Sequence, residues 1–223
     1  MKVILFGATG MIGAGVLMEC LVDARVQAVL SISRSPSGIR HPRLRELIRT
    51  NFMQYDDLKT ELTGWDACFF CLGVSSAGMN EADYQRITYD LTVATAEALG
   101  AWNPGIVFIY VSGAGTDSTE LGRMMWARVK GRTENRLLRM PKIKACMFRP
   151  GFIQPLKGVR SKTRLYQAFY TMARPLFPVI KRLMPTQITT TENVGRAMIE
   201  VAARGHPKRV LEIADINALA HPA

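Results

Sequence analysis

A glycine-rich turn near the amino terminus constrains the fold of this chain more than any other feature. The turn has the sequence Gly7-Ala8-Thr9-Gly10-Met11-Ile12-Gly13 and follows the apolar run Lys2–Phe6. It leads into residues 11–21, whose apolar side chains recur at helical spacing and predict a helix. A strand, a glycine turn and a helix in this order are typical of a dinucleotide-binding fold. Small residues let the backbone approach a pyrophosphate, and the helix N-terminus binds it. A tight turn without a ligand is the alternative interpretation.

Strand and helix patterns alternate along the rest of the chain. We expect strands at 27–32, 49–53, 66–71, 106–111, 143–148 and 209–213, and helices at 81–99, 120–140 and 192–203, with a short helix after the basic loop 34–43. The strands are apolar on both faces, which indicates a parallel sheet covered by helices. The sequence therefore predicts an α/β protein, a Rossmann-type doubly wound parallel sheet with a small C-terminal elaboration.

The predicted domain has three parts. Residues 1–155 form the dinucleotide-binding core, residues 156–190 form a substrate or lid segment, and residues 191–223 add a final helix and strand that complete the single domain. A length of 223 residues with 48% hydrophobic and 21% charged residues suits one well-formed core and argues against disorder. The apolar runs are far shorter than the ~18–20 residues of a membrane span, and we expect no secretory signal.

The four cysteines, Cys20, Cys68, Cys71 and Cys146, lie in apolar surroundings. Cys68 and Cys71 have the spacing of a CxxC motif, but they fall in a predicted strand. Side chains alternate along a strand, so an odd separation directs the two thiols to opposite faces. No second cysteine pair or nearby histidine completes a metal site. We expect no metal and a reducing, cytoplasmic location.

The end of the second predicted strand bears on the choice of dinucleotide. A site that prefers NAD usually has an acidic residue about 20 residues beyond the glycine turn, where it holds the ribose 2′-hydroxyl. This chain has Ser31-Ile32-Ser33-Arg34-Ser35 there, and no acid between Asp23 and Glu46. A guanidinium with neighbouring hydroxyls suits a 2′-phosphate. NADP is therefore favoured over NAD, and a solvated loop arginine is the alternative interpretation of Arg34.

Four further motifs follow in order within residues 1–155: Cys71-Leu72-Gly73, Val111-Ser112-Gly113-Ala114, Val129-Lys130-Gly131 and Arg149-Pro150-Gly151-Phe152. Together with the glycine turn they resemble the short-chain dehydrogenase/reductase superfamily, in its atypical and extended branch. The chain is most similar to small NAD(P)H-binding proteins like the Tat-interacting protein family and to epimerase-like proteins. The C-terminal third matches only by its final helix and strand.

The resemblance implies a role for each matching position. The turn residues from Gly7 to Gly13 would face the pyrophosphate. Ser112 would hydrogen-bond the reacting carbonyl or hydroxyl, and Lys130 would bind the nicotinamide ribose. The other implied cofactor contacts are Ser33 and Arg34 at the adenosine phosphate, Cys71, Leu72 and Gly73 along the adenine ribose, and Pro150, Gly151, Phe152 and Ile153 beside the nicotinamide.

One position departs from the family pattern. Active members carry a tyrosine four residues before the lysine, where its phenol acts as general acid or base. This chain has Trp126 there, and an indole N–H only donates a hydrogen bond. Substitutes for the phenol are Tyr110, for which burial in the sheet is the favoured interpretation, and the weaker candidates Tyr89, Tyr166 and Tyr170. No histidine is placed to make Ser112 a hydrolase nucleophile.

Basic residues outnumber acidic ones by 29 to 18, which gives a formal net charge of +11. Part of this charge lies in residues 157–185, among aromatic and apolar side chains. This segment suits a cover over an anionic or amphipathic small-molecule substrate. Peripheral contact with an anionic membrane surface is an alternative, and nucleic acid is disfavoured because no recognised motif accompanies the charge.

Two functions remain open from the sequence. The favoured hypothesis is an NADP(H)-dependent oxidoreductase or epimerase-like protein of the atypical short-chain type, with an unknown substrate. The alternative is a non-catalytic NADP(H)-binding protein that senses the redox state of the cofactor or binds a partner. A monomer and a homodimer are both compatible with the chain.

Overall fold

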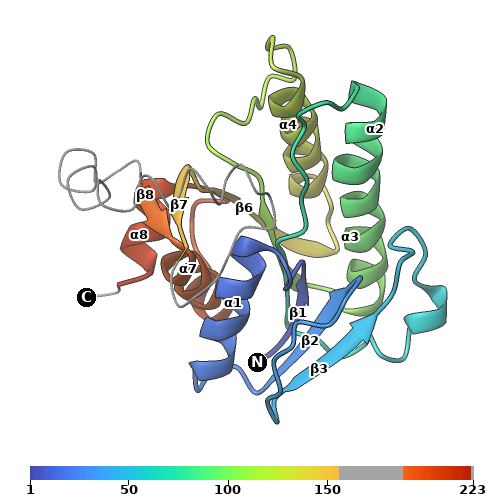
Figure 1. Ribbon diagram of the computed structural model, residues 1–223, viewed down its shortest axis with the longest axis vertical. Coiled ribbons are helices and arrows are strands. Elements are labelled where there is room, and N and C mark those ends of the chain that lie inside the picture. Colours follow the sequence, from blue (N-terminus) through green and yellow to red (C-terminus); the bar gives the residue numbers. More distant parts are fainter. Residues whose placement is uncertain (156–187, 222–223) are drawn as a thin grey trace.

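The computed structural model describes residues 1–155 and 188–221, and Figure 1 traces them. A parallel seven-stranded sheet in the order β3-β2-β1-β4-β5-β6-β9 forms the centre. This confirms the predicted doubly wound sheet. The strands are β1 (Lys2–Phe6), β2 (Ala28–Ser33), β3 (Leu44–Ile48), β4 (Ala67–Phe70), β5 (Ile106–Val111), β6 (Ile143–Arg149) and β9 (Val210–Glu212).

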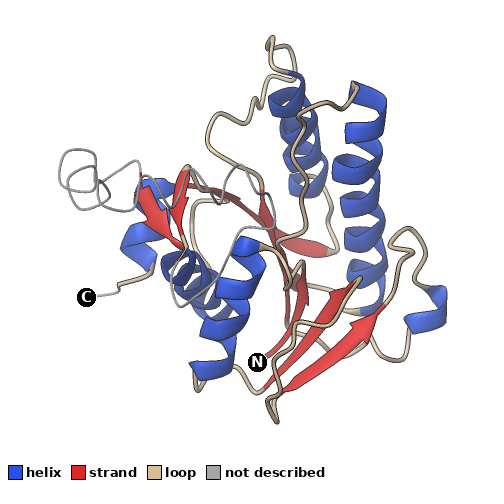
Figure 2. Cartoon of the chain, viewed as in Figure 1, coloured by secondary structure: helices blue, strands red, loops and turns tan. Residues whose placement is uncertain are grey.

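Helices cover both faces of the sheet, as Figure 2 shows. One face carries α1 (Met11–Val22), α7 (Thr191–Arg204) and α8 (Ile213–Leu219), and the other carries α3 (Leu91–Trp102) and α4 (Met125–Leu138). An apolar layer fills each interface. The layer beneath α3 and α4 is rich in aromatic rings, among them Phe70 and Phe108, whose centroids lie 5.7 Å apart.

The C-terminal part of the chain is an integral part of this fold. Helix α7 packs closely on α1, because glycines remove the side chains that would separate them. A Cβ on Gly15 would lie 2.4 Å from the Cβ of Thr191, and a Cβ on Gly195 would lie 2.9 Å from the Cβ of Glu19. Strand β9 then pairs with β6 at the edge of the sheet. The predicted helix at 192–203 and strand at 209–213 are therefore confirmed.

Two predictions near the second strand were wrong. Residues Leu44–Ile48, which we expected to be a short helix, form strand β3, and residues 49–53 form no strand. Apolar residues at 44, 47 and 48 match helical spacing, but pairing with β2, which joins Ser31 to Glu46, determines the local structure. This is an edge strand, where the apolar pattern is weak.

Other boundaries differ less. The helix predicted at 81–99 is α2 (Glu81–Gln85), a π-helical turn η2 (Arg86–Asp90) and α3 in continuation. Helix α4 begins at Met125 rather than at residue 120. Helix α8 and three short elements were not predicted: η1 (Asp56–Leu58) and the strands β7 (Phe152–Gln154) and β8 (Ile188–Thr190), which pair in parallel as a small second sheet.

Residues 156–187 lie outside the described part of the chain. The predicted lid segment, the basic residues 157–185, Tyr166 and Tyr170 fall there. Within residues 1–155 and 188–221, none of the helices combines the length and the apolar character that a membrane span requires.

Candidate functional site

The strand order reverses between β1 and β4, and ligands of open α/β sheets bind outside the carboxyl ends of the strands at such a point. Gly7 follows β1 and Cys71 follows β4. The two loops are in contact, because a Cβ on Gly7 would lie 2.8 Å from the carbonyl atoms of Cys71. Leu72 is half-buried beside them, and Gly73 is exposed. The motifs at 7–13 and 71–73, far apart in sequence, thus lie side by side at the carboxyl edge of the sheet.

The glycine turn brings its backbone close to the start of α1. Gly7 has a φ of +83°, which favours glycine. The amide of Gly10 donates to the Gly7 carbonyl at 2.9 Å. A Cβ on Gly13 would lie 2.1 Å from the same carbonyl oxygen, so a side chain there has no space. Among the described residues no side chain caps Gly10 and no acid lies in the first turn of α1. The amides of this turn are therefore available to an anion.

Ser33 and Arg34 lie beside this turn, because Phe6 at the end of β1 pairs with Ile32. Ser33 is buried, and its hydroxyl donates to the carbonyl of Ser35 at 2.7 Å. Arg34 is exposed, and its guanidinium has no hydrogen-bond or ion-pair partner among the described residues. The arginine is therefore an unpaired cationic group, within the described residues, at this end of β2.

One acidic residue, Glu46, lies close to the loop after β2 although it is distant from the glycine turn in sequence. Glu46 lies on β3, and its carboxylate accepts a hydrogen bond from the Ser37 amide at 2.8 Å. Counting residues from the glycine turn could not find it, since only the pairing of β3 with β2 brings Glu46 next to the loop.

Ser112 and Lys130 come together at the carboxyl end of β5. The Lys130 ammonium donates to the backbone carbonyl of Ser112. Burial lowers the pKa of Lys130 to about 8, although the carboxylate of Glu134 acts in the opposite direction. The Ser112 hydroxyl is buried and donates to Glu134 at 2.5 Å, with the Phe148 carbonyl at 3.2 Å. The serine side chain is therefore bonded to the protein interior.

Glu134 is a site residue that the sequence analysis missed. Its side chain is 1% exposed and forms an ion pair with Arg149. The same guanidinium bonds the Ser118 hydroxyl at 2.6 Å and reaches Glu212 of β9 at 3.3 Å. A carboxylate one helical turn after Lys130 was the available signal. This network joins α4, β6 and β9 around Ser112.

The remaining predicted residues have distinct environments. The Trp126 indole packs beside Gly115, where a Cβ would lie 3.5 Å from the ring. The Ala114 amide bonds the Pro150 carbonyl at 3.0 Å, which keeps the 150–153 segment next to the loop after β5. Gly151 and Phe152 are half-buried, while Ile153 is buried and pairs with Thr189 in the small sheet.

Tyr110 is a poor substitute for the missing phenol. It is 1% exposed and lies in the aromatic layer, with its ring centroid 6.1 Å from that of Phe70. Burial raises the pKa of its phenol far above the ordinary value. Tyr89 lies half-buried in the π-helical turn η2.

The cysteines have structural environments. Cys68 belongs to the apolar layer beneath α3 and α4, and Cys71 packs against the opposite layer, which confirms the predicted opposite faces. Burial raises the pKa of both thiols. In the described part of the chain no group of three or more histidine, cysteine or acidic side chains is arranged to hold a metal ion.

No protein-family model matches the chain. Curated relatives match at low identity. "Leucinostatins biosynthesis cluster protein T" of Purpureocillium lilacinum is 28% identical over 143 residues, which cover 63% of this chain and 52% of that protein. The chain thus spans about half the length of this relative. "Protein fmp52-2, mitochondrial" of Aspergillus oryzae is 24% identical over 220 residues, which cover 96% of this chain and 94% of that protein.

These relatives overturn one expectation. Several carry "mitochondrial" in their names, among them the proteins of Aspergillus oryzae and Debaryomyces hansenii. The predicted cytoplasmic location is therefore contradicted. The prediction rested on unpaired cysteines in apolar surroundings, and buried thiols do not distinguish one reducing compartment from another.

Solved structures share the fold. A dTDP-glucose 4,6-dehydratase from Streptomyces venezuelae with NAD and TYD bound has a TM-score of 0.67 at 14% identity, over 99% of this chain and 80% of that chain. A UDP-glucuronic acid 4-epimerase from Bacillus cereus in complex with NAD has a TM-score of 0.66 at 16% identity, over 96% and 81%. The PhqB reductase domain from Penicillium fellutanum has a TM-score of 0.68 at 17% identity, over 96% and 67%. The chain has the Rossmann-type fold of these dehydratase, epimerase and reductase enzymes.

Proposed function

We propose that this chain is an NADP(H)-dependent oxidoreductase or epimerase-like protein of the short-chain dehydrogenase/reductase type. The observation that carries the proposal is the glycine cradle at the point where the strand order reverses. A Cβ at Gly13 would clash with the Gly7 carbonyl, so the turn packs directly on the start of α1, and the first-turn amides of α1 are uncapped. A diphosphate fits such a site, since it needs close backbone approach and unpaired N–H donors.

Arg34 supports the choice of NADP. Its guanidinium is exposed at the carboxyl end of β2, next to the glycine turn, and has no partner among the described residues. It would hold the 2′-phosphate through charge-assisted hydrogen bonds. The similar dehydratase and epimerase structures hold NAD, so the preference for NADP rests on this residue.

A nicotinamide dinucleotide, when bound, supplies or accepts a hydride. The proton that accompanies hydride transfer has to come from the protein or from water. Lys130 is our candidate donor, because its ammonium keeps two N–H groups beyond the bond to Ser112, and a pKa of about 8 allows proton release near neutral pH. The indole N–H of Trp126 does not ionise at such pH and cannot act as the acid.

Turnover tests the enzymatic proposal. We expect NADPH-dependent reduction of members of a broad carbonyl panel, with Lys130→Met lowering the rate by about 10²–10⁴-fold. Lys142→Met removes an exposed lysine at the opposite end of the sheet and should leave the rate unchanged. Trp126→Tyr restores a phenol four residues before Lys130 and should raise it. No turnover by either the unaltered chain or Trp126→Tyr would contradict an enzymatic role.

A non-catalytic NADP(H)-binding sensor is the second candidate. The bond from the Ser112 hydroxyl to Glu134 favours it, because the serine then has no free proton to offer a substrate. This candidate predicts tight dinucleotide binding, no turnover across the panel, and a partner whose binding depends on the redox state of the cofactor. A small anionic or amphipathic substrate, peripheral membrane contact, and a monomeric or dimeric state remain predictions from the sequence.

A further inference from the structure

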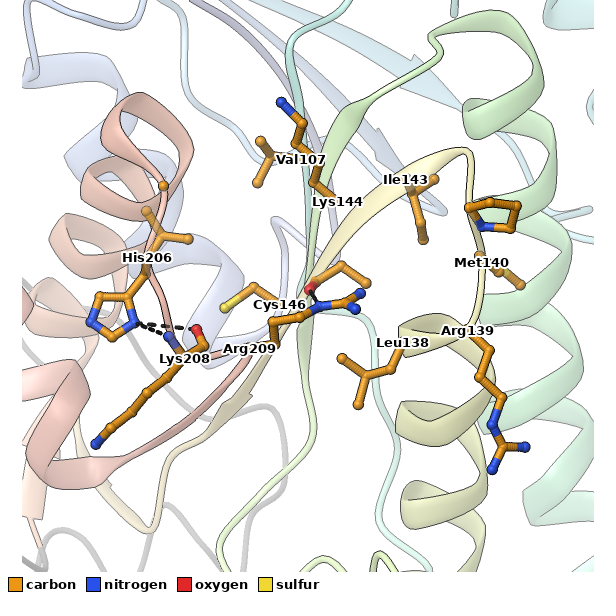
Figure 3. Close-up of a pocket in the computed structure, with 14 residues that line it drawn as sticks. Val107, Leu138, Arg139, Met140, Ile143, Lys144, Cys146, His206, Lys208 and Arg209 are labelled. Atoms are coloured by element: carbon orange, nitrogen blue, oxygen red, sulfur yellow. Dashed lines mark hydrogen bonds between the residues drawn. The ribbon is translucent and has the colours of Figure 1, made fainter.

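A cavity lies at the opposite end of the sheet from the glycine turn. It has a volume of about 490 Å³ and opens where β5 and β6 begin, between the C-terminal ends of α4 and α7 (Figure 3). This volume falls in the range of small-molecule sites. None of its lining residues belongs to the proposed dinucleotide site.

Arg209 reaches into this cavity from the start of β9. Strand β9 pairs with β6 only from Met147 onward, so before that residue no strand of the described part of the chain pairs with this edge of β6. The Arg209 carbonyl accepts from the Met147 amide at 2.8 Å, and its Nε donates to the Ala145 carbonyl at 3.2 Å. The two terminal amino groups of the guanidinium have no partner among the described residues. Figure 3 shows the Arg209 guanidinium between Cys146 and Leu138.

The other charges of the cavity wall are also positive. Among the described residues, no aspartate or glutamate lines the cavity, whereas Arg139, Lys144 and Lys208 do. Lys208 pairs with Asp215 at 2.6 Å. Arg139 is the C-cap residue of α4, where positive charge is favourable. Lys144 is exposed and has no ion-pair partner among the described residues. Its side chain lies beside Val107 and points away from Arg209 (Figure 3), so Arg209 is the cation that faces the apolar side of the cavity.

The floor of the cavity is apolar. Leu138 and Met140 contribute from the end of α4 and the loop after it, and Ile143 contributes from β6. An apolar floor beside a forked cation suits a ligand with a hydrocarbon part and an anionic head, since a guanidinium binds a carboxylate or phosphate through two parallel hydrogen bonds. We propose that this cavity binds a small amphipathic anion, with its head on Arg209 and its chain on Leu138, Met140 and Ile143.

Calorimetric titration below micellar concentration tests this site with four probes. Decanoate and decyl phosphate carry both parts of the expected ligand, and we expect both to bind. Inorganic phosphate lacks the chain and decyltrimethylammonium reverses the charge, so each should bind at least about tenfold more weakly, which corresponds to about 1.4 kcal/mol. The tighter of the two anions identifies the preferred head group. No heat with either anion, or equal binding of decyltrimethylammonium, would overturn the proposal.

Matched variants assign the binding to this cavity. Arg209→Gln should weaken decanoate at least about tenfold by removing a charge-assisted contact, and Arg209→Glu should abolish binding. Arg123→Gln removes an exposed arginine from the loop before α4 and should change nothing. Thermal unfolding verifies that each variant is folded. NADPH affinity should stay unchanged in Arg209→Gln, so this test is independent of the dinucleotide site. Equal decanoate affinity in Arg209→Gln and the unaltered chain would refute the assignment.

Discussion

The glycine turn and the cluster around Ser112 lie on the same edge of the sheet, yet they differ in what builds them. The turn is made by backbone: Gly7, Gly13 and the amides of α1 form its surface. The cluster is made by side chains, and its polar groups bond one another, Ser112 to Glu134 and Glu134 to Arg149. The turn thus leaves donors for a ligand, whereas the cluster uses its polar groups for internal structure. Binding and chemistry are separable properties of this fold.

Gly13→Ala is expected to have the largest effect, and it acts only on the turn. The added Cβ would lie 2.1 Å from the Gly7 carbonyl oxygen, so the turn has to move. Overpacking of this kind costs about 1–3 kcal/mol, and loss of the phosphate contacts should lower NADPH affinity by about 100-fold. Fluorescence titration of NADPH measures the change. Gly195→Ala is the control, because its Cβ would lie 2.9 Å from the Cβ of Glu19 between α1 and α7 and so overpacks the protein away from the turn. Similar losses in both variants would contradict the cradle.

Glu134→Gln should have a comparable effect on stability and acts only on the cluster. It leaves the guanidinium of Arg149, whose side chain is 13% exposed, without its buried partner. Breaking a buried ion pair costs about 3 kcal/mol of unfolding free energy, which urea denaturation measures. Glu97→Gln breaks the exposed pair with Arg136 and should cost less than about 1 kcal/mol. Equal stability of the two variants would show that the network contributes little.

Arg34→Ala tests the dinucleotide binding that we assign to the region of the glycine turn. Removal of a charge-assisted hydrogen bond costs about 1.5–3 kcal/mol, so NADPH affinity should fall by about ten- to 100-fold. NADH lacks the 2′-phosphate, and its affinity should change little. Parallel titrations of the two dinucleotides measure the ratio. Equal losses for both would remove the support for NADP.

The pH dependence of turnover tests whether Lys130, in the cluster around Ser112, donates the proton. Lys130 can donate a proton only below its pKa of about 8, so the rate of carbonyl reduction should fall as the pH rises through that value. Between pH 7 and pH 9 the protonated fraction, and with it the rate, should fall about tenfold. Lys130→Arg keeps its charge over this range and should give a flat profile at a lower rate. A flat profile in the unaltered chain would exclude Lys130 as the donor.

The same contrast explains what the sequence could predict. Local order along the chain was sufficient for the glycine turn, since strand, turn and helix are consecutive, and for the buried strands, whose apolar runs are continuous. The edge strand β3 was missed because its residues at 44, 47 and 48 match helical spacing, and only pairing with β2 determines its structure.

The side-chain partners at the site could not be predicted from sequence spacing, because they depend on contacts between distant parts of the chain. Glu134 lies 22 residues from Ser112 in sequence and 2.5 Å from its hydroxyl in space. Arg149 was seen as part of a motif, but its ion pair with Glu134 requires α4 to lie across β6. The cavity at Arg209 likewise arises from the late start of β9, which no local pattern indicates.

Titration of the purified chain with NADPH, NADP⁺, NADH and NAD⁺ by calorimetry tests the dinucleotide site most directly. We predict saturable binding with one site per chain and a clear preference for the two phosphorylated forms. Absence of heat with all four ligands at millimolar concentration would show that the glycine turn holds no pyridine dinucleotide.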